Sequence, residues 1–351
     1  MKVYKGTDKD MRCKGLQYEI GKAVTVDGEI KLCERGLHAC EMPLDVLNYY
    51  PPATSRYFVA ELDGVTDEKQ DDTKRVGNKL ALKAELSIAG LVKAQIEYIK
   101  EKATQENTEH ATGTQGAASA TGTWGAASAT GTRGAASATG TQGAASATGY
   151  RGAASATGTQ GAASATGYRG AASATGTQGA ASATGYGGAA SATGTRGAAS
   201  ATGYRGAASA TGTQGAASAT GYGGAASATG PWGAVSATGT RGAASATGYG
   251  GAASATGTWG AASATGTQGA ASATGYCGAA SATGKACVAL SAGIDGKVMG
   301  EIGNAIVCVE RGDWNGETYP IKAILSAVVD GETIKAGVWY TVKDGKWVEA
   351  K

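Results

Sequence analysis

The sequence predicts a mainly β protein built on a two-sided β-solenoid, with an N-terminal α+β domain and a small C-terminal β cap. Three observations carry this prediction. A nine-residue unit, Gly-Ala-Ala-Ser-Ala-Thr-Gly plus two variable residues, recurs nineteen times without insertion between Gly116 and Gly284. The variable residues alternate from unit to unit, so the structural period is eighteen residues, two units per coil. Short fixed repeats of this kind are typical of stacked arrays.

The variable residues distinguish the two edges of the predicted coil. One edge carries tyrosine at its first variable position and arginine at its second in many coils. We name this the tyrosine–arginine edge; its residues are Arg133, Tyr150, Arg151, Tyr168, Arg169, Tyr186, Tyr204, Arg205, Tyr222 and Arg241. The other edge, here the glutamine edge, carries mostly threonine and then glutamine, and Arg196 is its one arginine.

Within each unit we expect a strand, Ala-Ala-Ser-Ala-Thr, and a tight Gly-x-x-Gly turn, because glycine tolerates positive φ. Side chains alternate along a strand. Val235, the one bulkier residue among the repeat alanines, replaces the second alanine of its unit, which favours an interior made of the second and fourth strand residues. An alanine interior buries little area, so backbone hydrogen bonds between coils must contribute strongly. The unit also divides into triplets, so a bundle of polyproline-II segments is an alternative.

The array divides the chain into an N-terminal domain at 1–107, the solenoid at 108–286 and a cap at 287–351. The chain has a formal net charge of +3, and the repeats contain six arginines and no acid. That density is low for a dedicated nucleic-acid-binding domain. We see neither a secretory signal nor an apolar run of membrane-spanning length, so we expect a cytoplasmic or virion-associated protein without membrane insertion. The six cysteines are expected to be free thiols.

The N-terminal domain alternates strand-like and helical patterns. Pro43 suits the first turn of a helix to Tyr50, which Pro51 and Pro52 terminate. A second helix, with apolar residues at helical spacing over 91–99, leads towards the solenoid. Strands are expected at 3–5, 16–20, 23–26, 32–40, 56–62 and 80–88.

Several short motifs in this domain support a family resemblance. They are Tyr4-Lys5-Gly6, Cys13-Lys14-Gly15-Leu16-Gln17-Tyr18-Glu19, Gly36-Leu37-His38-Ala39-Cys40-Glu41, Pro43-Leu44-Asp45-Val46, Tyr49-Tyr50-Pro51-Pro52 and Ala84-Glu85-Leu86. The segment resembles an uncharacterised domain of phage and gut-bacterial proteins, in several of which Gly-Ala-Ala-Ser-Ala-Thr-Gly arrays follow. The resemblance implies no activity. The array is more loosely similar to the β-roll heads of trimeric bacterial adhesins, although we recognise no signal peptide, coiled-coil stalk or membrane anchor.

Two hypotheses concern chemistry in the N-terminal domain. Soft ligands for a metal would be Cys13, Cys33, His38 and Cys40, although their spacing fits no standard zinc module and ordinary packing of buried thiols is the alternative. The order of motifs is also similar to that of ADP-ribosyltransferase folds, in which a polar residue on a strand and a later glutamate hold NAD. The residues to test would then be His38, Tyr50 and Glu61; the alternative is a structural domain, with no cofactor and no enzymatic activity.

Two further hypotheses concern the array. The tyrosine–arginine edge could bind a polyanion, a single-stranded nucleic acid or a cell-surface ligand by charge and stacking; alternatively, the tyrosines stabilise the stack. Both faces of the rod are expected to be flat Ser-x-Thr arrays, as in ice-binding solenoids. Alternatively, the serines and threonines serve only to keep a simple sheet soluble. Such faces could also pair two copies into a homo-oligomer.

The C-terminal cap continues the repeat pattern with larger apolar residues in place of alanine, as a terminal cap should. Strands are expected at 305–309, 321–329, 333–335 and 339–342, followed by a hairpin to 346–349. Its core should contain Trp314, Trp339, Tyr340 and Trp347. Together these features predict a non-enzymatic, phage- or prophage-related repeat protein. Its rod-like solenoid is expected to separate two capping domains and to act as a spacer or a multivalent binding surface.

Overall fold

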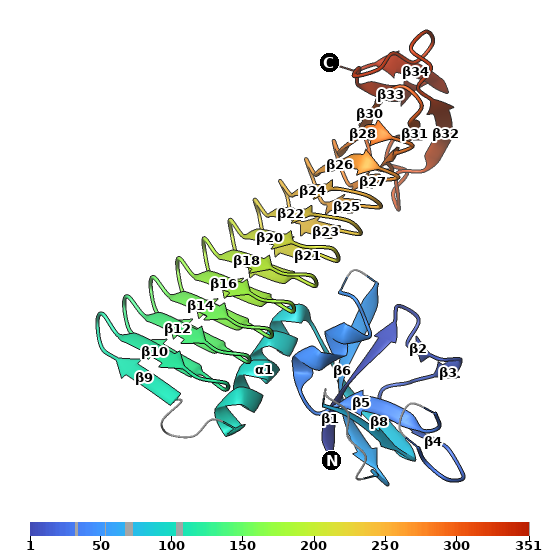
Figure 1. Cartoon of the computed structure of the whole chain (residues 1–351). Coiled ribbons are helices and arrows are strands. Elements are labelled where there is room, and N and C mark those ends of the chain that lie inside the picture. Colours follow the sequence, from blue (N-terminus) through green and yellow to red (C-terminus); the bar gives the residue numbers. More distant parts are fainter. Residues whose placement is uncertain (32–33, 53, 67–72, 103–107, 351) are drawn as a thin grey trace.

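Alanine-rich strands of the repeat stack into two parallel sheets that form a long solenoid (Figure 1). The computed structural model describes residues 1–31, 34–52, 54–66, 73–102 and 108–350. Within them the solenoid makes about 11 turns between residues 109 and 308. The mainly β solenoid and the mixed N-terminal domain that the sequence predicts are therefore confirmed.

The two sheets take alternate strands, which we call the even sheet and the odd sheet. The even sheet holds β10 (Ala117–Thr121), β12 (Ala135–Thr139), β14 (Ala153–Thr157), β16 (Ala171–Thr175), β18 (Ala189–Thr193), β20 (Ala207–Thr211), β22 (Ala225–Thr229), β24 (Ala243–Thr247), β26 (Ala261–Thr267) and β28 (Ala279–Lys285). The odd sheet holds β9 (Thr108–Thr112), β11 (Ala126–Thr130), β13 (Ala144–Thr148), β15 (Ala162–Thr166), β17 (Ala180–Thr184), β19 (Ala198–Thr202), β21 (Ala216–Thr220), β23 (Ala234–Thr238), β25 (Ala252–Thr256) and β27 (Ala270–Thr274).

Every repeat residue in a strand lies beside the equivalent residue eighteen positions away. In β14 and β16, for example, Ala153 pairs with Ala171 and Ser155 with Ser173, in parallel. This register confirms the eighteen-residue coil and rules out the polyproline-II alternative, whose segments have no such ladder. Because identical residues stack on identical residues, every coil satisfies the backbone groups of its neighbours.

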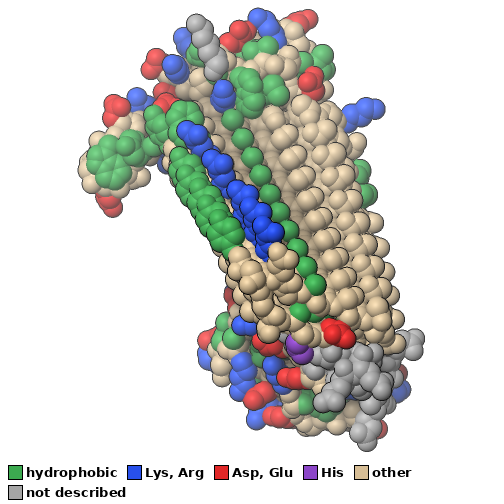
Figure 2. Space-filling view, turned by 90° about the vertical axis from the view of Figure 1, so that its left-hand side faces the viewer, with side chains coloured by type: hydrophobic (Ala, Val, Ile, Leu, Met, Phe, Trp, Pro, Cys, Tyr) green, Lys and Arg blue, Asp and Glu red, His purple; other side chains and the backbone are tan. Residues whose placement is uncertain are grey.

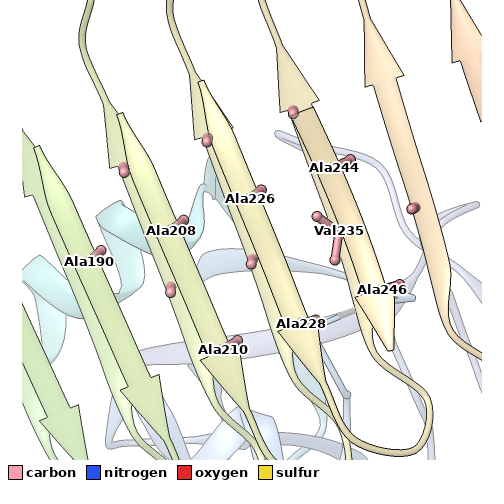
Figure 3. Close-up of a cluster of buried hydrophobic side chains, with 14 of the residues drawn as sticks. Ala190, Ala208, Ala210, Ala226, Ala228, Val235, Ala244 and Ala246 are labelled. Carbon is pink, nitrogen blue, oxygen red and sulfur yellow. The ribbon is translucent and has the colours of Figure 1, made fainter. Parts of the chain in front are cut away.

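The interior of the solenoid is made of the second and fourth residues of each strand. Ala172 and Ala174 of β16 are 3% and 1% exposed, and Val235 lies among such alanines (Figure 3). The inward direction inferred from Val235 is thus confirmed. Alanine side chains add little apolar area each, so stability must come from repetition and from the backbone ladders.

The N-terminal domain has a six-stranded sheet in the order β4-β8-β6-β1-β5-β7. The predicted helix after Pro43 is a short 3-10 helix, and β7 was not predicted. The elements are β1 (Lys2–Asp8), β2 (Arg12–Cys13), β3 (Leu16–Gln17), β4 (Ala23–Thr25), β5 (Leu37–Cys40), η1 (Pro43–Asn48), β6 (Ser55–Asp63), β7 (Lys74–Gly77), β8 (Lys79–Leu86) and α1 (Ile88–Lys102).

Helix α1 lies between the N-terminal domain and the odd sheet (Figure 1). Its Leu91, Ile96 and Ile99 share one core with η1 and with the first alanines of β11, β13, β15 and β17. These alanines are 0–1% exposed, whereas the first alanines of the even strands β10 to β26 are exposed. The N-terminal domain therefore covers the flank of the solenoid, and the expected arrangement of a rod that separates two end domains is corrected.

At the other end, larger side chains continue both stacks. β29 (Val288–Ser291), β30 (Lys297–Gly300) and β31 (Ala305–Arg311) pair in parallel with the preceding coils, so the coil extends into the segment assigned to the cap. Antiparallel β32 (Ile321–Val328), β33 (Tyr340–Lys343) and β34 (Lys346–Glu349) then close the sheets. Tyr340 is buried there, but Trp314 is 56% exposed and is not a core residue.

Candidate functional site

Five tyrosines of the tyrosine–arginine edge form a column of stacked rings. Tyr150, Tyr168, Tyr186, Tyr204 and Tyr222 have neighbouring ring centroids 4.8–5.0 Å apart and interplanar angles of 1–9°. The side chains are 41–52% exposed. Because each inner ring has another ring on both faces, its edge and its hydroxyl face solvent. The column thus presents a line of phenol groups and not a set of open stacking platforms.

A row of arginines runs beside the tyrosine column. Figure 2 shows the tyrosines as a green column and the arginines as a parallel blue column on the same side of the rod. Arg133, Arg151, Arg169, Arg205 and Arg241 are exposed. In the described part of the chain, no ion pair joins these guanidinium groups to a carboxylate. The edge is therefore a linear array of unneutralised positive charge, interrupted where Gly187 and Gly223 occupy the arginine position.

The glutamine edge has a different role, because its side chains form hydrogen bonds with the N-terminal domain. Gln160 hydrogen-bonds Asp45, and Gln178 hydrogen-bonds Asn48. Arg196, the one arginine on this edge, donates from Nη1 to Asn48 Oδ1 at 3.0 Å. The exception in the repeat pattern thus has a structural explanation: a longer side chain reaches η1 from the next coil.

The two faces of the rod are unequal, which limits the ice-binding hypothesis. Helix α1 covers the odd sheet from β11 to β19. The open even sheet forms a groove of about 1280 Å³, lined by the alanines and serines of β10 to β28 and by Trp339. Two free, flat Ser-x-Thr faces, as the sequence predicts, are therefore not present.

The N-terminal domain contains a cavity of about 340 Å³, which we name the Lys5 cavity. Cys13, His38, Cys40 and Tyr50, all singled out in the sequence, line it. Glu61 does not; it lies on β6 with its side chain paired to Lys83 at 2.6 Å. The three residues proposed for an ADP-ribosyltransferase-like site are thus not brought together.

The position of Cys13, His38 and Cys40 at the Lys5 cavity does not support the hypothesis of a metal site. Among the residues that the structure describes, no three His, Cys, Asp or Glu side chains are close enough to hold a metal ion. Cys33 lies outside the described residues. The five described cysteines are free thiols, as expected.

Sequence reasoning missed the central residue of this cavity, Lys5. Its side chain is 3% exposed, and Nζ donates hydrogen bonds to the His38 carbonyl at 2.8 Å and to Cys13 Sγ at 3.3 Å. Burial lowers the pKa of Lys5 below its usual range. The available signal was a lysine between tyrosine and glycine in the middle of a strand, whose five central residues are all buried in the structure.

Burial also shifts the pKa values of the other titratable groups that line the cavity. Burial, and after it the charges of Lys5, Lys74 and Lys14, lowers the pKa of His38 to about 4, so the imidazole is neutral at pH 7. Burial raises the pKa of Tyr18 and of Tyr50 above the usual range of a phenol. Both phenols therefore keep their protons near neutral pH.

Comparisons with known proteins bear on the N-terminal domain alone. Neither the curated proteins nor the solved structures contain a significant match to this chain. No helix in the described residues has the length and apolarity needed to cross a membrane. One family model, of a domain of unknown function, DUF7666, matches residues 1–94, which contain every residue of the Lys5 cavity. Residues 1–94 are therefore a DUF7666 domain, and a β-solenoid follows this domain in the chain.

Proposed function

We propose that the solenoid is a multivalent binding surface whose tyrosine–arginine edge takes a linear acidic polysaccharide. One observation carries the proposal: a column of phenol groups runs parallel to a row of unpaired guanidinium groups, and the two lie in the same coil at Tyr150, Tyr168 and Tyr204. A linear polymer with regularly spaced carboxylates or sulfates can contact many coils at once. Individually weak contacts then add, because each further site binds at high effective concentration.

The packing of the tyrosine rings favours a polysaccharide over a single-stranded nucleic acid. Nucleobases bind such surfaces by stacking on open aromatic faces. Here the neighbouring tyrosines occupy those faces, with centroids at most 5.0 Å apart. Phenol hydroxyls and ring edges remain, and these suit hydroxyl and carboxylate groups.

The test is binding of the full chain to polygalacturonate, with neutral dextran and single-stranded DNA as comparison ligands. Changing Arg133, Arg151, Arg169, Arg205 and Arg241 to Gln should weaken polygalacturonate binding by about 100-fold or more, since five solvent-exposed contacts are lost. Glutamine occupies the equivalent position on the opposite edge, so the fold should persist. Binding should also weaken steeply with added salt.

The chain supplies a matched control. Arg196→Gln removes one arginine from the glutamine edge and should leave polygalacturonate binding unchanged, because Arg196 faces the N-terminal domain. Polygalacturonate binding that survives loss of the five arginines would refute the proposed site. Tighter binding of DNA than of polygalacturonate would refute the ligand class.

A further inference from the structure

The Lys5 cavity is positively charged and has the size of a small-molecule site. Lys5, Lys14 and Lys74 line it, and among the described residues that line it there is no aspartate or glutamate. Its volume of about 340 Å³ lies within the range of small-ligand sites. Since His38 is neutral at pH 7, the lysines set the sign of the field. A small anion is the ligand that this charge distribution favours.

The amine of Lys5 is held in one place by contacts on several sides. Nζ donates to the His38 carbonyl and to Cys13 Sγ, and it lies 5.4 Å and 5.9 Å from the ring centroids of Tyr18 and Tyr50. A neutral amine has two N–H bonds, which these two acceptors can engage. Its lone pair then remains for an electrophile. Lysines become nucleophiles when they are desolvated or lie near another cation, and both conditions hold for Lys5.

Hydrogen bonding and close packing also hold the side chains around Lys5 in place. The Tyr50 hydroxyl donates to Cys13 Sγ at 2.7 Å, which links η1 and its following turn to the β2–β3 hairpin. Gly6, next to Lys5, makes room for this: a Cβ there would lie 2.5 Å from Tyr50 Cγ. The glycine of the Tyr4-Lys5-Gly6 motif thus allows the tyrosine ring to pack on β1. The cavity wall is therefore part of the fold of the domain.

From this geometry we propose that the Lys5 cavity binds a small 2-oxo carboxylate and captures it as an imine on Lys5 Nζ. The amine attacks the carbonyl carbon, a C=N bond replaces C=O, and the oxygen leaves as water with the two amine protons. Lys14 holds the carboxylate of the ligand, and Lys74, whose Nζ lies 4.7 Å from the centroid of the Tyr49 ring, adds positive charge to the cavity. Tyr18 and Tyr50 keep their phenol protons and shield the amine from bulk solvent. The site is independent of the polysaccharide-binding edge.

Trapping by reduction tests this proposal on the unmodified full chain. Pyruvate is added at pH 7 with sodium cyanoborohydride, and intact mass and peptide mapping locate the adduct. Lys5 should carry most of it, because burial lowers its pKa and so gives it a larger share of neutral amine than solvent-exposed lysines have at the same pH. Absence of an adduct on Lys5, or equal labelling of exposed lysines, would overturn the proposal without any variant that might fail to fold. Lys5→Met, where it folds, should lose the adduct.

The anion preference is tested by a double variant. Lys14→Gln with Lys74→Gln should raise the pyruvate concentration for half-maximal labelling about tenfold, since two partly screened charges are removed. Labelling by acetone, which has the carbonyl but no carboxylate, should fall less than labelling by pyruvate, because the variant also removes Lys14, whose charge lowers the pKa of Lys5. The matched change Lys9→Gln with Lys93→Gln, outside the cavity, should alter neither. Equal loss of pyruvate and acetone labelling in the cavity variant would reject the carboxylate site.

Discussion

At the scale of single residues, the last glycine of each repeat decides whether the coils can stack. Gly185 has φ of +150°, and a Cβ on it would lie 1.5 Å from the carbonyl oxygen of Gly167 in the preceding coil. Gly187, two residues later at a variable position, has no heavy atom within 4 Å of its Cβ direction. Two glycines in one turn therefore have opposite constraints.

We expect Gly185→Ala to lower the free energy of unfolding by about 3 kcal/mol or more, because the backbone of two coils must separate. Gly187→Ala should change it by less than about 1 kcal/mol and in the stabilising direction, since alanine reduces the freedom of the unfolded chain. Urea unfolding followed by circular dichroism measures both. Similar unfolding midpoints for the two variants would show that the close carbonyl contact is not limiting.

At the scale of elements, the turns change type along the solenoid. In early coils the second variable residue donates to the preceding coil, as from Arg169 N to Tyr150 O. From Trp232 onward on the glutamine edge it donates to the following coil, here to Tyr249 O, and its φ is positive. Pro231 precedes the first such turn and suits the second position of a type II turn, whose third position requires positive φ.

On the tyrosine–arginine edge the column of stacked rings ends before the turn type changes, because Thr240 takes the position that follows Tyr222. On the tyrosine–arginine edge the new turn type begins at Trp259, and the ring of Trp259 meets Tyr276 edge-on at 83°. Stacked tyrosines therefore belong to the first turn type, in which the rings project in parallel from coil to coil. The length of the proposed binding edge is therefore set by which coils carry tyrosine and arginine.

The change of turn type predicts that glycine substitutions at two glutamines of the glutamine edge have opposite effects on stability. Gln268 has φ of +58°, whereas Gln214 is not among the residues with positive φ. Gln268→Gly should raise the free energy of unfolding by about 1 kcal/mol, because a left-handed conformation is costly for a residue with a Cβ. Gln214→Gly should lower it by about 0.5–1 kcal/mol, since glycine loses more freedom on folding. Thermal unfolding measures both, and changes of the same sign would contradict the turn assignment.

At the scale of the whole molecule, identical repeat residues have different environments because the N-terminal domain covers one flank. Ala162 of β15 is 0% exposed under α1, whereas Ala171 of β16 is exposed on the even sheet. Both are the first alanine of an unchanged Ala-Ala-Ser-Ala-Thr strand. The chain thus contains its own matched control for the docking of α1.

Ala162→Glu should destabilise the protein by about 3 kcal/mol or more, since a carboxylate would be buried against α1 without a partner. Ala171→Glu should cost less than about 1 kcal/mol at its exposed position. Hydrogen exchange should accelerate in α1 for the first variant alone. Equal exchange of α1 in both variants would mean that the helix does not depend on the odd sheet.

The sequence by itself determined the solenoid, because a period of eighteen residues permits one in-register stacking and because Val235 marks the inward side. It also determined the order of residues on each edge, since the eighteen-residue period assigns every variable pair to one edge. It did not show that Arg196 serves domain docking, or that His38, Cys13 and Tyr50 meet at Lys5 while Glu61 does not. These relations join residues far apart in the chain, and no local pattern records them.

Only the tertiary structure decided which face of the rod is covered and which group is central to the cavity. The two sheets have the same strand sequence, so the choice of the odd sheet depends on where α1 and η1 reach it. The pKa of the Lys5 amine is lowered because β5, the β2–β3 hairpin and the turn after η1 bury it. Burial and electrostatics are properties of the assembled fold, and a repeat pattern or a strand propensity contains neither.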